Sequence, residues 1–390
     1  MDGLEGLLVA VFVGSIAGVL LVFGLYPLAV LCAGWLRPER RPAANAPMPS
    51  VSLLVAVRNG EALVTEKVRN SLALRHASER QAVFVSDGST DRTVERLRAE
   101  AGPGVEVLEI VEHHGKAHAL NAGAERCRGE ILVFSDADAL LPPDALEWLT
   151  APFADPSVGG VCGQRVIHDG DGNGLSAAQG SYIAADSGLK RAESRLGSVT
   201  SNDGKLYAIR RELFRPIAAG ATDDLYACLT VVEQGRRFVF EPRARALIRT
   251  PSRDAGHELA RRRRIVARSL HGISAKRALL NPFRHGAFAF QLLVNKVCRR
   301  LLPLFLIGLL VSSLALSFRA GHWIARLALA GQLGSILLAL AQPALARLPG
   351  LGKPASTARY FWVGILGTLL GLADFARGRE AVKWEPRKSG

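Results

Sequence analysis

Two carboxylates that follow an apolar run are the first residues of this sequence whose type and spacing indicate chemistry. Asp136 and Asp138 stand one residue apart after Ile131–Ser135, a run with the composition of a buried strand. Carboxylates that leave one strand end together can hold a hard divalent cation, because Mg²⁺ and Mn²⁺ prefer oxygen ligands. The same spacing also occurs in turns and helix caps, so the prediction of a metal site depends on the residues beside the pair.

Polar residues follow two further apolar runs. Arg58 and Glu61 come after the run 51–57, and Asp87 comes after the run 82–86. Asp87 opens a sequence typical of a turn before a capped helix. At the end of a strand it could also accept hydrogen bonds from a nucleobase or ribose.

Lys116 stands beside Gly115 at the start of the predicted helix 117–127. A phosphate is attracted to the positive end of a helix, so this lysine is a candidate phosphate ligand. The segment is not a P-loop, because it lacks the second glycine and the Ser or Thr after the lysine.

A second carboxylate pair and a run of arginines each allow a simpler interpretation. Asp223 and Asp224 precede the predicted helix 225–232, where they could serve as a helix N-cap. The run 261–264 is four arginines, which could form a basic surface that faces anionic lipid.

Apolar runs alternate along the chain with charged stretches of helical period. They predict strands at 51–57, 82–86, 105–110, 131–135 and 158–161, and helices at 90–100 and 117–127. This alternation indicates βαβ units, and therefore an α/β fold with a mainly parallel sheet. Because ligands bind at the carboxyl ends of such strands, Arg58, Asp87 and Asp136 are expected to lie at one edge of the sheet.

The composition narrows the class of protein. The 390 residues are 49% hydrophobic and 22% charged, and 49 Lys and Arg against 35 Asp and Glu give a net charge of +14. These values exclude a disordered chain, and the positive charge favours anionic partners such as nucleotides or anionic lipid. Nucleic acid is not an expected partner, because the sequence has no RNP-like, zinc-finger or aromatic-basic pattern. The five cysteines include no CxxC pair, which favours free thiols in a reducing compartment.

Long charge-free runs separate membrane segments from the rest of the chain. Residues 6–36 contain no charged residue, and the stretch 7–33 within them exceeds the roughly 20 apolar residues that cross a bilayer. The arginines that follow place the next part of the chain in the cytosol. The expected division is a transmembrane helix at 1–36, a linker at 37–49, a cytosolic α/β domain at 50–282, an interfacial helix at 283–299, a transmembrane region at 300–376 and a basic tail at 377–390.

The last apolar segment allows two topologies. The runs 301–318 and 327–346 are each long enough to span a membrane, whereas 360–373 is short. If this short run spans, the basic tail lies outside, against the positive-inside tendency. If it lies on the membrane surface, the tail stays cytosolic.

The ordered set of motifs is more specific than any one of them. In chain order it reads RNGE, SDGSTD, HGKAHALN, SDAD, YAIRREL, TDD and RRRRI, between an N-terminal membrane helix and C-terminal ones. This set resembles the membrane-embedded family 2 glycosyltransferases, and among them the synthases of hyaluronan, cellulose and poly-N-acetylglucosamine. The resemblance implies a GT-A fold, which is a Rossmann-like α/β domain, with flanking transmembrane helices. It also implies an inverting transfer that requires Mg²⁺ or Mn²⁺.

The resemblance further implies roles for particular residues. The implied donor-binding residues are Arg58, Glu61, Asp87, Lys116, Asp136, Arg261 and Arg264, the metal ligands are Asp138 and Asp136, the catalytic residues are Asp224 and Asp223, and the acceptor residues are Asp203 and Gly204. Asp224 would be the general base for the acceptor hydroxyl. The chemistry agrees, because a departing nucleoside diphosphate builds negative charge that a cation, Lys and Arg stabilise.

Several positions depart from the family pattern. Ala56 and Gly60 stand where the opening motif has a proline and a glutamate, so Glu61 would substitute in that loop. Arg261 replaces the glutamine of the QxxRW motif, and Ile265 replaces its tryptophan. That tryptophan borders the acceptor in processive synthases, so its absence weakens the prediction of polymerisation.

We therefore expect an inner-membrane enzyme of bacterial type, with its catalytic domain in the cytosol, that moves a sugar from UDP-GlcNAc or UDP-Glc to a growing polysaccharide. A nonprocessive transferase with a lipid acceptor is the alternative on the same fold. A catalytically silent glycan-binding subunit is the alternative of another class. The expected partners are a UDP-sugar, a glycan or lipid acceptor and membrane lipid, with accessory export subunits as further candidates.

Overall fold

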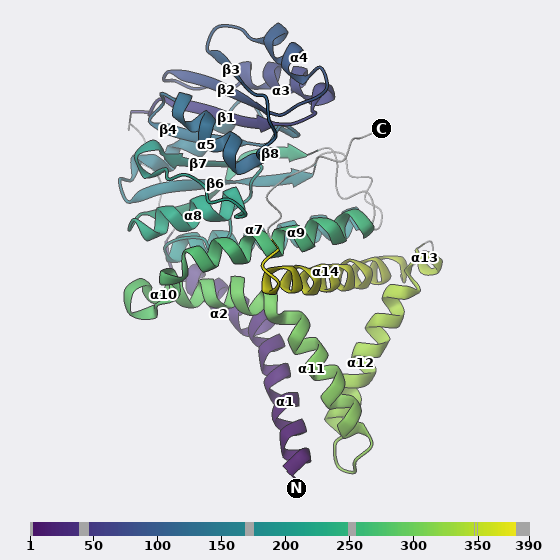
Figure 1. The fold of residues 1–390 in the computed structure, drawn as a ribbon. Coiled ribbons are helices and arrows are strands. Elements are labelled where there is room, and N and C mark those ends of the chain that lie inside the picture. The colour runs from purple at the N-terminus through teal and green to yellow at the C-terminus, as the bar shows by residue number, and fades with distance from the viewer. Residues whose placement is uncertain are drawn as a thin grey trace.

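The structure is a computed structural model that describes residues 3–38, 47–167, 175–248, 255–346, 348 and 350–379. An α/β domain lies on one side of a group of long helices (Figure 1). Most of the predicted linker at 37–49 and of the predicted basic tail at 377–390 lies outside the described residues.

A mixed sheet with eight strands in the order β3-β2-β1-β4-β7-β6-β8-β5 forms the centre of the domain. The strands are β1 Val51–Val57, β2 Arg80–Asp87, β3 Val105–Ile110, β4 Ile131–Ser135, β5 Ala139–Leu140, β6 Val158–Ile167, β7 Leu206–Arg210 and β8 Arg237–Ile248. The pairs β1–β2, β1–β4, β2–β3 and β6–β8 are parallel, whereas β7 runs antiparallel between β4 and β6, and β5 antiparallel beside β8. The prediction of an α/β fold with a mainly parallel sheet is confirmed.

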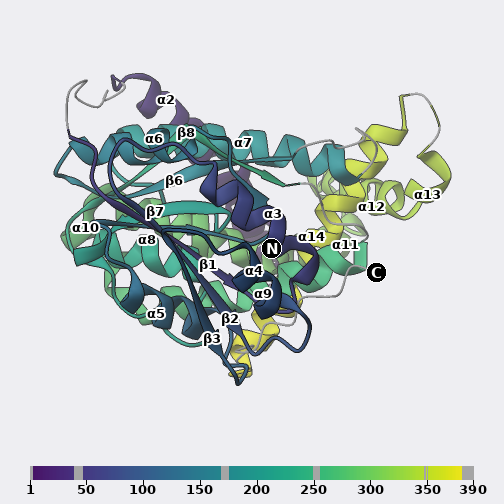
Figure 2. The same cartoon turned by 90° about the horizontal axis from the view of Figure 1, so that it is seen from above.

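Helices cover both faces of this sheet (Figure 2). They are α3 Glu61–Leu72, α4 Thr93–Glu100, α5 Lys116–Arg126, α6 Ala145–Thr150, α7 Leu175–Leu196 and α8 Asp223–Glu233, with short 3-10 turns at Ala151–Ala154, Arg211–Leu213 and Arg277–Leu280. The next helix, α9 Ala255–Ala275, packs against α8. Alternate strand residues point to opposite faces, so Leu54 belongs to the core cluster that includes residues of α5 and α8, whereas Leu53 belongs to the one that includes residues of α3, α4 and α6. A strand buried on both faces reads as a continuous apolar run, which is why β1 was visible in the sequence.

Three helical segments are long and apolar enough to cross a membrane: Gly3–Trp35, Pro282–Ser317 and Trp323–Leu340. They comprise α1 Gly3–Leu20, α2 Tyr26–Trp35, α10 Pro282–Leu292, α11 Arg299–Ser317 and α12 Trp323–Leu340, with π-helical turns at Leu21–Leu25 and Leu293–Cys298. Large apolar side chains such as Leu7, Val11, Leu333 and Leu337 are exposed on α1 and α12, as expected for helices that face lipid. In Figure 1, α1, α11 and α12 extend away from the α/β domain.

The last long helix, α14 Gly352–Ala376, follows the short α13 Gln342–Leu345 and lies across the direction of α1, α11 and α12 (Figure 1). It packs closely against α9, because a Cβ at Gly367 would lie 2.8 Å from Arg262 Cβ and a Cβ at Gly371 would lie 2.6 Å from the Arg263 carbonyl oxygen. Arg263 also pairs with Asp374 at 2.8 Å. This helix is not among the three candidate spans found in the described residues.

A buried polar network joins the membrane helices to the α/β domain. Glu193 on α7 accepts hydrogen bonds from Tyr26 on α2, from the Thr200 backbone nitrogen at 2.8 Å and from Asn295 Nδ2 at 3.0 Å. Asn295 also donates to Thr200 Oγ1 at 2.8 Å. Buried polar groups are costly unless they are paired, so this network fixes the loop after α7 to both membrane segments.

Candidate active site

The ends of several strands and helices bring together residues that are far apart in the sequence. Lys116 at the start of α5 places its Nζ 2.7 Å from Asp136 Oδ1, after β4, and 2.9 Å from Asp223 Oδ2, at the start of α8. Tyr207 on β7 donates to Asp223 Oδ2 at 3.3 Å. The structure therefore joins the HGKA, SDAD and TDD segments in one charged cluster.

Lys205 completes this cluster, and the sequence analysis missed it. Its Nζ lies 2.6 Å and 2.8 Å from the two carboxylate oxygens of Asp138, and 3.0 Å from Asp136 Oδ2. The register explains the position, because β4 and β7 pair Ser135 with Leu206 and so bring Asp136, the residue after β4, opposite Lys205. The only signal was a lysine directly before an apolar run, which has no meaning until the antiparallel pairing is known.

Two lysines hold the Asp136 carboxylate in its charged form. Burial alone would raise the pKa of Asp136, but Lys116 and Lys205 hold it well below its usual range. A third lysine, Lys67 on α3, is fully buried and donates to Ser135 Oγ at 2.8 Å and to the Ala139 carbonyl oxygen. Burial lowers the pKa of Lys67 to about 7, against the opposing effect of Asp136 and Asp138. Lys67 therefore supports the DxD turn from within the domain.

The two carboxylates at the start of α8 have different environments. The N-cap residue of this helix is Thr222, so the aspartates occupy the first turn instead of the cap. Asp223 is bonded to Lys116 and Tyr207, whereas the Asp224 carboxylate accepts a hydrogen bond from its own neighbour, Leu225 N, at 2.7 Å. Burial, and then the charge of Asp223, raise the pKa of Asp224 to about 6. Asp224 can therefore accept a proton close to neutral pH.

The predicted acceptor loop lies against Asp224. Asn202 Nδ2 donates to the Asp224 carbonyl oxygen at 3.1 Å, and a Cβ at Gly204 would lie 3.7 Å from Asp224 Oδ2. Glycine at this position keeps space open beside the carboxylate. The Asp203 carboxylate instead pairs with Arg165 on β6 at 3.3 Å.

The other predicted donor residues hold loops together. Asp87 is 3% exposed, and its oxygens accept from His114 N at 2.9 Å and Gly115 N at 2.8 Å, while His113 Nδ1 lies at 2.8 Å. These bonds fix the turn that presents Lys116. Glu61, at the start of α3, accepts from the Arg92 backbone nitrogen at 3.1 Å and so joins the loops after β1 and β2.

The loop that carries Arg58 is joined to the loop after β2. Asn59, which follows Arg58, has a φ of 49° and accepts a hydrogen bond from Thr90 N at 2.8 Å. The next residue, Gly60, donates from its backbone nitrogen to Thr93 Oγ1 at 2.8 Å. Arg58 is therefore held at the same edge of the sheet as Asp87.

The arginines of the RRRRI segment do not share one environment. Arg261 and Arg262 both pair with the buried Glu258, at 2.9 Å and 2.8 Å. Arg264 makes no ion pair with any residue in the described ranges. Burial and the neighbouring charges of Arg268 and Arg261 lower the pKa of Arg264, and Asp136 acts in the opposite direction. Of the two predicted residues, Arg264 is thus the cation left available near Asp136.

The carboxylates of Asp136 and Asp138 suit a single hard cation. They converge on one ammonium group, that of Lys205, so their oxygens already face a common cationic position. Within the described ranges no group of three or more His, Cys, Asp or Glu residues could enclose a metal. A cation here would take its remaining ligands from water and from a bound diphosphate, as Mg²⁺ commonly does.

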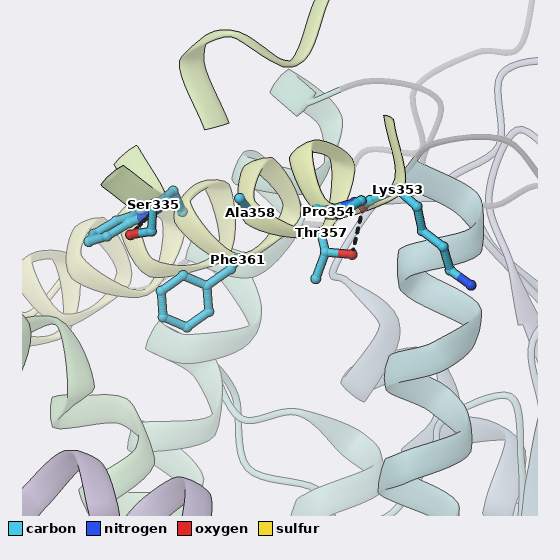
Figure 3. A pocket seen from close by; sticks show the side chains of 7 residues that line it. Ser335, Lys353, Pro354, Thr357, Ala358 and Phe361 are labelled. Atoms are coloured by element: carbon cyan, nitrogen blue, oxygen red, sulfur yellow. Dashed lines mark hydrogen bonds between the residues drawn. The ribbon is translucent and has the colours of Figure 1, made fainter. Parts of the chain in front are cut away.

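A cavity of about 570 Å³ lies between α12 and α14, away from this cluster (Figure 3). Its lining includes Ser335, Pro354, Thr357, Phe361 and Trp362, with no carboxylate among them. In Figure 3 the Thr357 hydroxyl is bonded to the Lys353 carbonyl oxygen of its own helix at 3.0 Å. The cavity is mainly apolar and offers no group for sugar transfer.

Comparison with known proteins identifies the class of this domain. Residues 52–217 match the family described as "Glycosyl transferase family 2". A β-monoglucosyldiacylglycerol synthase of Synechocystis is 29% identical over 204 residues, which cover 48% of this chain and 42% of that enzyme. A poly-β-1,6-N-acetyl-D-glucosamine synthase of Staphylococcus aureus is 23% identical over 220 residues, which cover 55% and 53%. The chain thus matches about half the length of these curated relatives.

One solved structure shares the architecture along almost the whole chain. The mannosyltransferase PcManGT of Pyrobaculum calidifontis, determined with GDP-Man and Mn²⁺, superposes with a TM-score of 0.70 at 23% identity, covering 97% of this chain and 100% of that one. Together with the motifs at the strand ends, this likeness shows a GT-A fold. The chain therefore carries a family 2 glycosyltransferase domain of GT-A fold, attached to helices that can cross a membrane.

Proposed function

We propose that the chain catalyses inverting, metal-dependent transfer of a sugar from a UDP-sugar to an acceptor held at the membrane. The observation that carries this proposal is the position of Asp224. It is a carboxylate with a pKa near 6 that lies beside a cluster of Lys116, Asp136 and Asp138. UDP-Glc and UDP-GlcNAc are the first donors to test, because the two curated relatives are named for glucosyl and N-acetylglucosamine products.

In the proposed site, most of the predicted residues serve the donor or the acceptor. Asp136 and Asp138 would hold Mg²⁺ or Mn²⁺, which when bound supplies positive charge to the departing diphosphate. Lys116 and Arg264 would add charge on the nucleotide side, while Arg58, Glu61 and Asp87 shape the nucleoside end and Arg261 keeps Glu258 paired. The structure with GDP-Man and Mn²⁺ concerns a protein of the same fold and supports a divalent metal here.

The proposed reaction is a single in-line displacement. Asp224 accepts the proton of the acceptor hydroxyl as its oxygen bonds to the anomeric carbon, and the bond from that carbon to the nucleoside diphosphate breaks. One displacement inverts the anomeric configuration. Asp223 fixes Lys116 and raises the proton affinity of Asp224, while Gly204 leaves room for the acceptor beside the base.

We infer that the acceptor is a lipid to which one sugar is added. The loop beside Asp224 contacts the membrane segment directly, because Lys296 donates to Ser201 Oγ at 2.8 Å. A lipid headgroup at the membrane surface would reach the base along this contact. The glycolipid synthase among the relatives supports this acceptor, and the poly-N-acetylglucosamine synthase supports the second candidate, a growing polysaccharide with export subunits.

Product length separates these two acceptors. With excess labelled donor and the full chain in bilayer nanodiscs, a lipid transferase is expected to give a lipid-soluble product with one sugar. Chains of many sugars that remain bound to the protein would contradict the lipid assignment and establish the polymer.

We also propose the topology expected from the sequence. The α/β domain at 50–282 would lie on the cytosolic side of a bacterial-type inner membrane, reached through the helix at 1–36. Residues 283–299 would lie at the interface and residues 300–376 would form the membrane region, with α14 on its surface and the tail at 377–390 in the cytosol. Protease cleavage of sealed right-side-out vesicles is expected to spare the α/β domain, and its digestion from outside would contradict this orientation.

The pH dependence of transfer should follow Asp224. A base must be ionised, so the rate is expected to fall as the pH drops through about 6. Asp223 raises that pKa by charge repulsion, so Asp223→Asn should move the acidic limb to lower pH. The limb is measured from kcat between pH 4.5 and 8. An unmoved limb in Asp223→Asn would mean that another group sets it.

Removal of the Lys205 charge should strengthen metal binding. Its ammonium occupies the position where the two DxD carboxylates meet, so it competes with a cation for them. We expect Lys205→Ala to raise Mn²⁺ affinity about tenfold, a change of about 1.4 kcal/mol, whereas Lys205→Arg keeps the competing charge. Calorimetric titration with Mn²⁺ measures both. Equal affinities in wild type and Lys205→Ala would show that the lysine moves aside without competing.

A further inference from the structure

A group of three cations lies where the membrane helices meet the α/β domain. Lys296, Arg299 and Arg300 occupy adjacent turns of one helical segment, and all three are half-buried. None of them forms an ion pair with a residue in the described ranges. Figure 1 shows the segment from α10 to the start of α11 beneath the α/β domain, before α11 extends away.

Every hydrogen bond of these three side chains goes to a neutral group. Lys296 Nζ donates to Ser201 Oγ at 2.8 Å, and Arg300 Nε donates to Ser269 Oγ at 2.8 Å. Arg299 donates to Asn295 Oδ1 at 3.2 Å and to the Tyr182 hydroxyl at 3.3 Å. Neutral oxygens therefore orient the charges. The nearby carboxylate of Asp186 also acts on Lys296 and Arg299, but its ion-pair partner is Lys190, at 2.8 Å.

Nearby arginines on α9, in contrast, form ion pairs with carboxylates. Arg262 and Arg263 are paired with Glu258 and Asp374. Arg268, beside Ser269, is 7% exposed and donates to the Ala221 carbonyl oxygen at 2.7 Å, but its buried Nε has no hydrogen-bond partner. Partly buried cations are costly unless an anion joins them.

The group borders the proposed base. Ser201 precedes Asn202, which is bonded to the Asp224 backbone, and Asp224 is among the charges that act on Arg300. Ala221 stands just before the TDD segment. The DxD carboxylates instead face Lys116 and Lys205, so the nucleotide already has its own cations.

We propose that Lys296, Arg299 and Arg300, with Arg268 beside them, bind the phosphate of an anionic lipid acceptor. Basic pockets between membrane helices on the cytosolic side recognise lipid phosphates in this way. The inference rests on the proposed transfer to a membrane acceptor and specifies its headgroup. The bound phosphate would hold the lipid so that its reacting oxygen faces the donor sugar beside Asp224.

Direct binding tests this site without requiring turnover. The probe is decyl phosphate, with 1-decanol as the neutral comparison, titrated into the full chain in phosphatidylcholine nanodiscs. The variant Lys296→Gln/Arg299→Gln/Arg300→Gln removes the charges. Arg284→Gln is the matched control, because Arg284 is exposed on α10 of the same membrane segment. UDP binding with Mn²⁺ is measured on each protein.

We expect the triple variant to bind decyl phosphate at least tenfold more weakly than wild type, with UDP binding and Arg284→Gln unchanged. Equal decyl phosphate affinity in wild type and the triple variant would overturn the proposal. Equal losses in the triple variant and Arg284→Gln would also overturn it, because diffuse surface charge would then explain binding. If the triple variant lost affinity for UDP and kept its affinity for decyl phosphate, the three cations would belong to the donor site and the proposal would be overturned.

Two further measurements keep the outcomes distinct. If thermal unfolding shows that the triple variant is not folded, Arg299→Gln alone is expected to weaken decyl phosphate binding and Arg299→Lys to restore most of it. UDP release from nucleotide sugars is recorded in parallel. Decyl phosphate binding at the group without UDP release from any donor would contradict the proposed function and leave the phosphate site standing.

Discussion

Asp224→Asn is expected to reduce sugar transfer by about three orders of magnitude, because general-base catalysis typically contributes 10²- to 10⁴-fold. The amide retains the shape of the side chain and can still contact Leu225 N, but it cannot take a proton. Donor affinity should stay within about twofold, since Asp224 lies on the acceptor side of the cluster. Transfer kinetics and UDP binding are measured on the same preparation.

The stability of the Asp224→Asn variant gives a second test of the raised pKa of Asp224. Burial and Asp223 raise the pKa of Asp224 to about 6, so its neutral form suits the fold and its ionised form, above that pH, destabilises it. Asp224→Asn should therefore raise the free energy of unfolding more at pH 8 than at pH 5, by an amount on the order of 1 kcal/mol after solvent screening.

Asp144→Asn is the control for this substitution, because Asp144 begins a different helix, α6, and bonds to Trp148. Unchanged activity in Asp224→Asn, or an equal loss in Asp144→Asn, would contradict the assignment of the base.

Asp138→Ala is expected to make donor binding independent of metal. Asp138 and Asp136 converge on one cationic position, and two carboxylates are the only acidic ligands that the described residues offer there. Loss of one should weaken UDP binding in the presence of Mn²⁺ by about 30-fold or more, because loss of one partner of a buried charge pair costs roughly 2 kcal/mol or more.

Chelation is the comparison for Asp138→Ala. Calorimetry with Mn²⁺ and with a chelator should give similar UDP affinities for the variant and different ones for wild type. A metal-dependent affinity in Asp138→Ala that equals the wild-type value would show that this carboxylate is not a ligand.

The sequence predicted the strands that are marked by local apolar runs. The strands at β1 to β4 and the start of β6 are apolar runs separated by amphipathic helices, which periodicity detects. The strands β7 and β8 were not predicted. The sequence YAIRR alternates too little to separate a strand from a helix, and β8 mixes arginines with apolar residues, because it lies toward the edge of the sheet.

Residues of the candidate site could be predicted from the sequence only where they belong to a recognisable motif. Lys116, Asp136 and Asp223 were singled out one by one, and the fold brings one carboxylate oxygen of each aspartate within 3 Å of Lys116 Nζ. Lys205 and Lys67 belong to no motif, and only the β4–β7 register and the burial of α3 give them a place. Asp87 shows the opposite case. Its motif is visible in the sequence and suggests contact with a ligand, but in the structure its oxygens bind the backbone of the loop before Lys116.

The most direct test of the central claim is release of nucleoside diphosphate by the full chain in nanodiscs that contain bacterial lipid extract. A panel of UDP-sugars and GDP-Man is supplied with Mg²⁺, Mn²⁺ or chelator, alongside Asp224→Asn. The account predicts metal-dependent release from a UDP-sugar, together with a labelled lipid product, and the loss of both in Asp224→Asn. Release from no donor in the presence of the lipid extract, or release that Asp224→Asn retains in full, would contradict it.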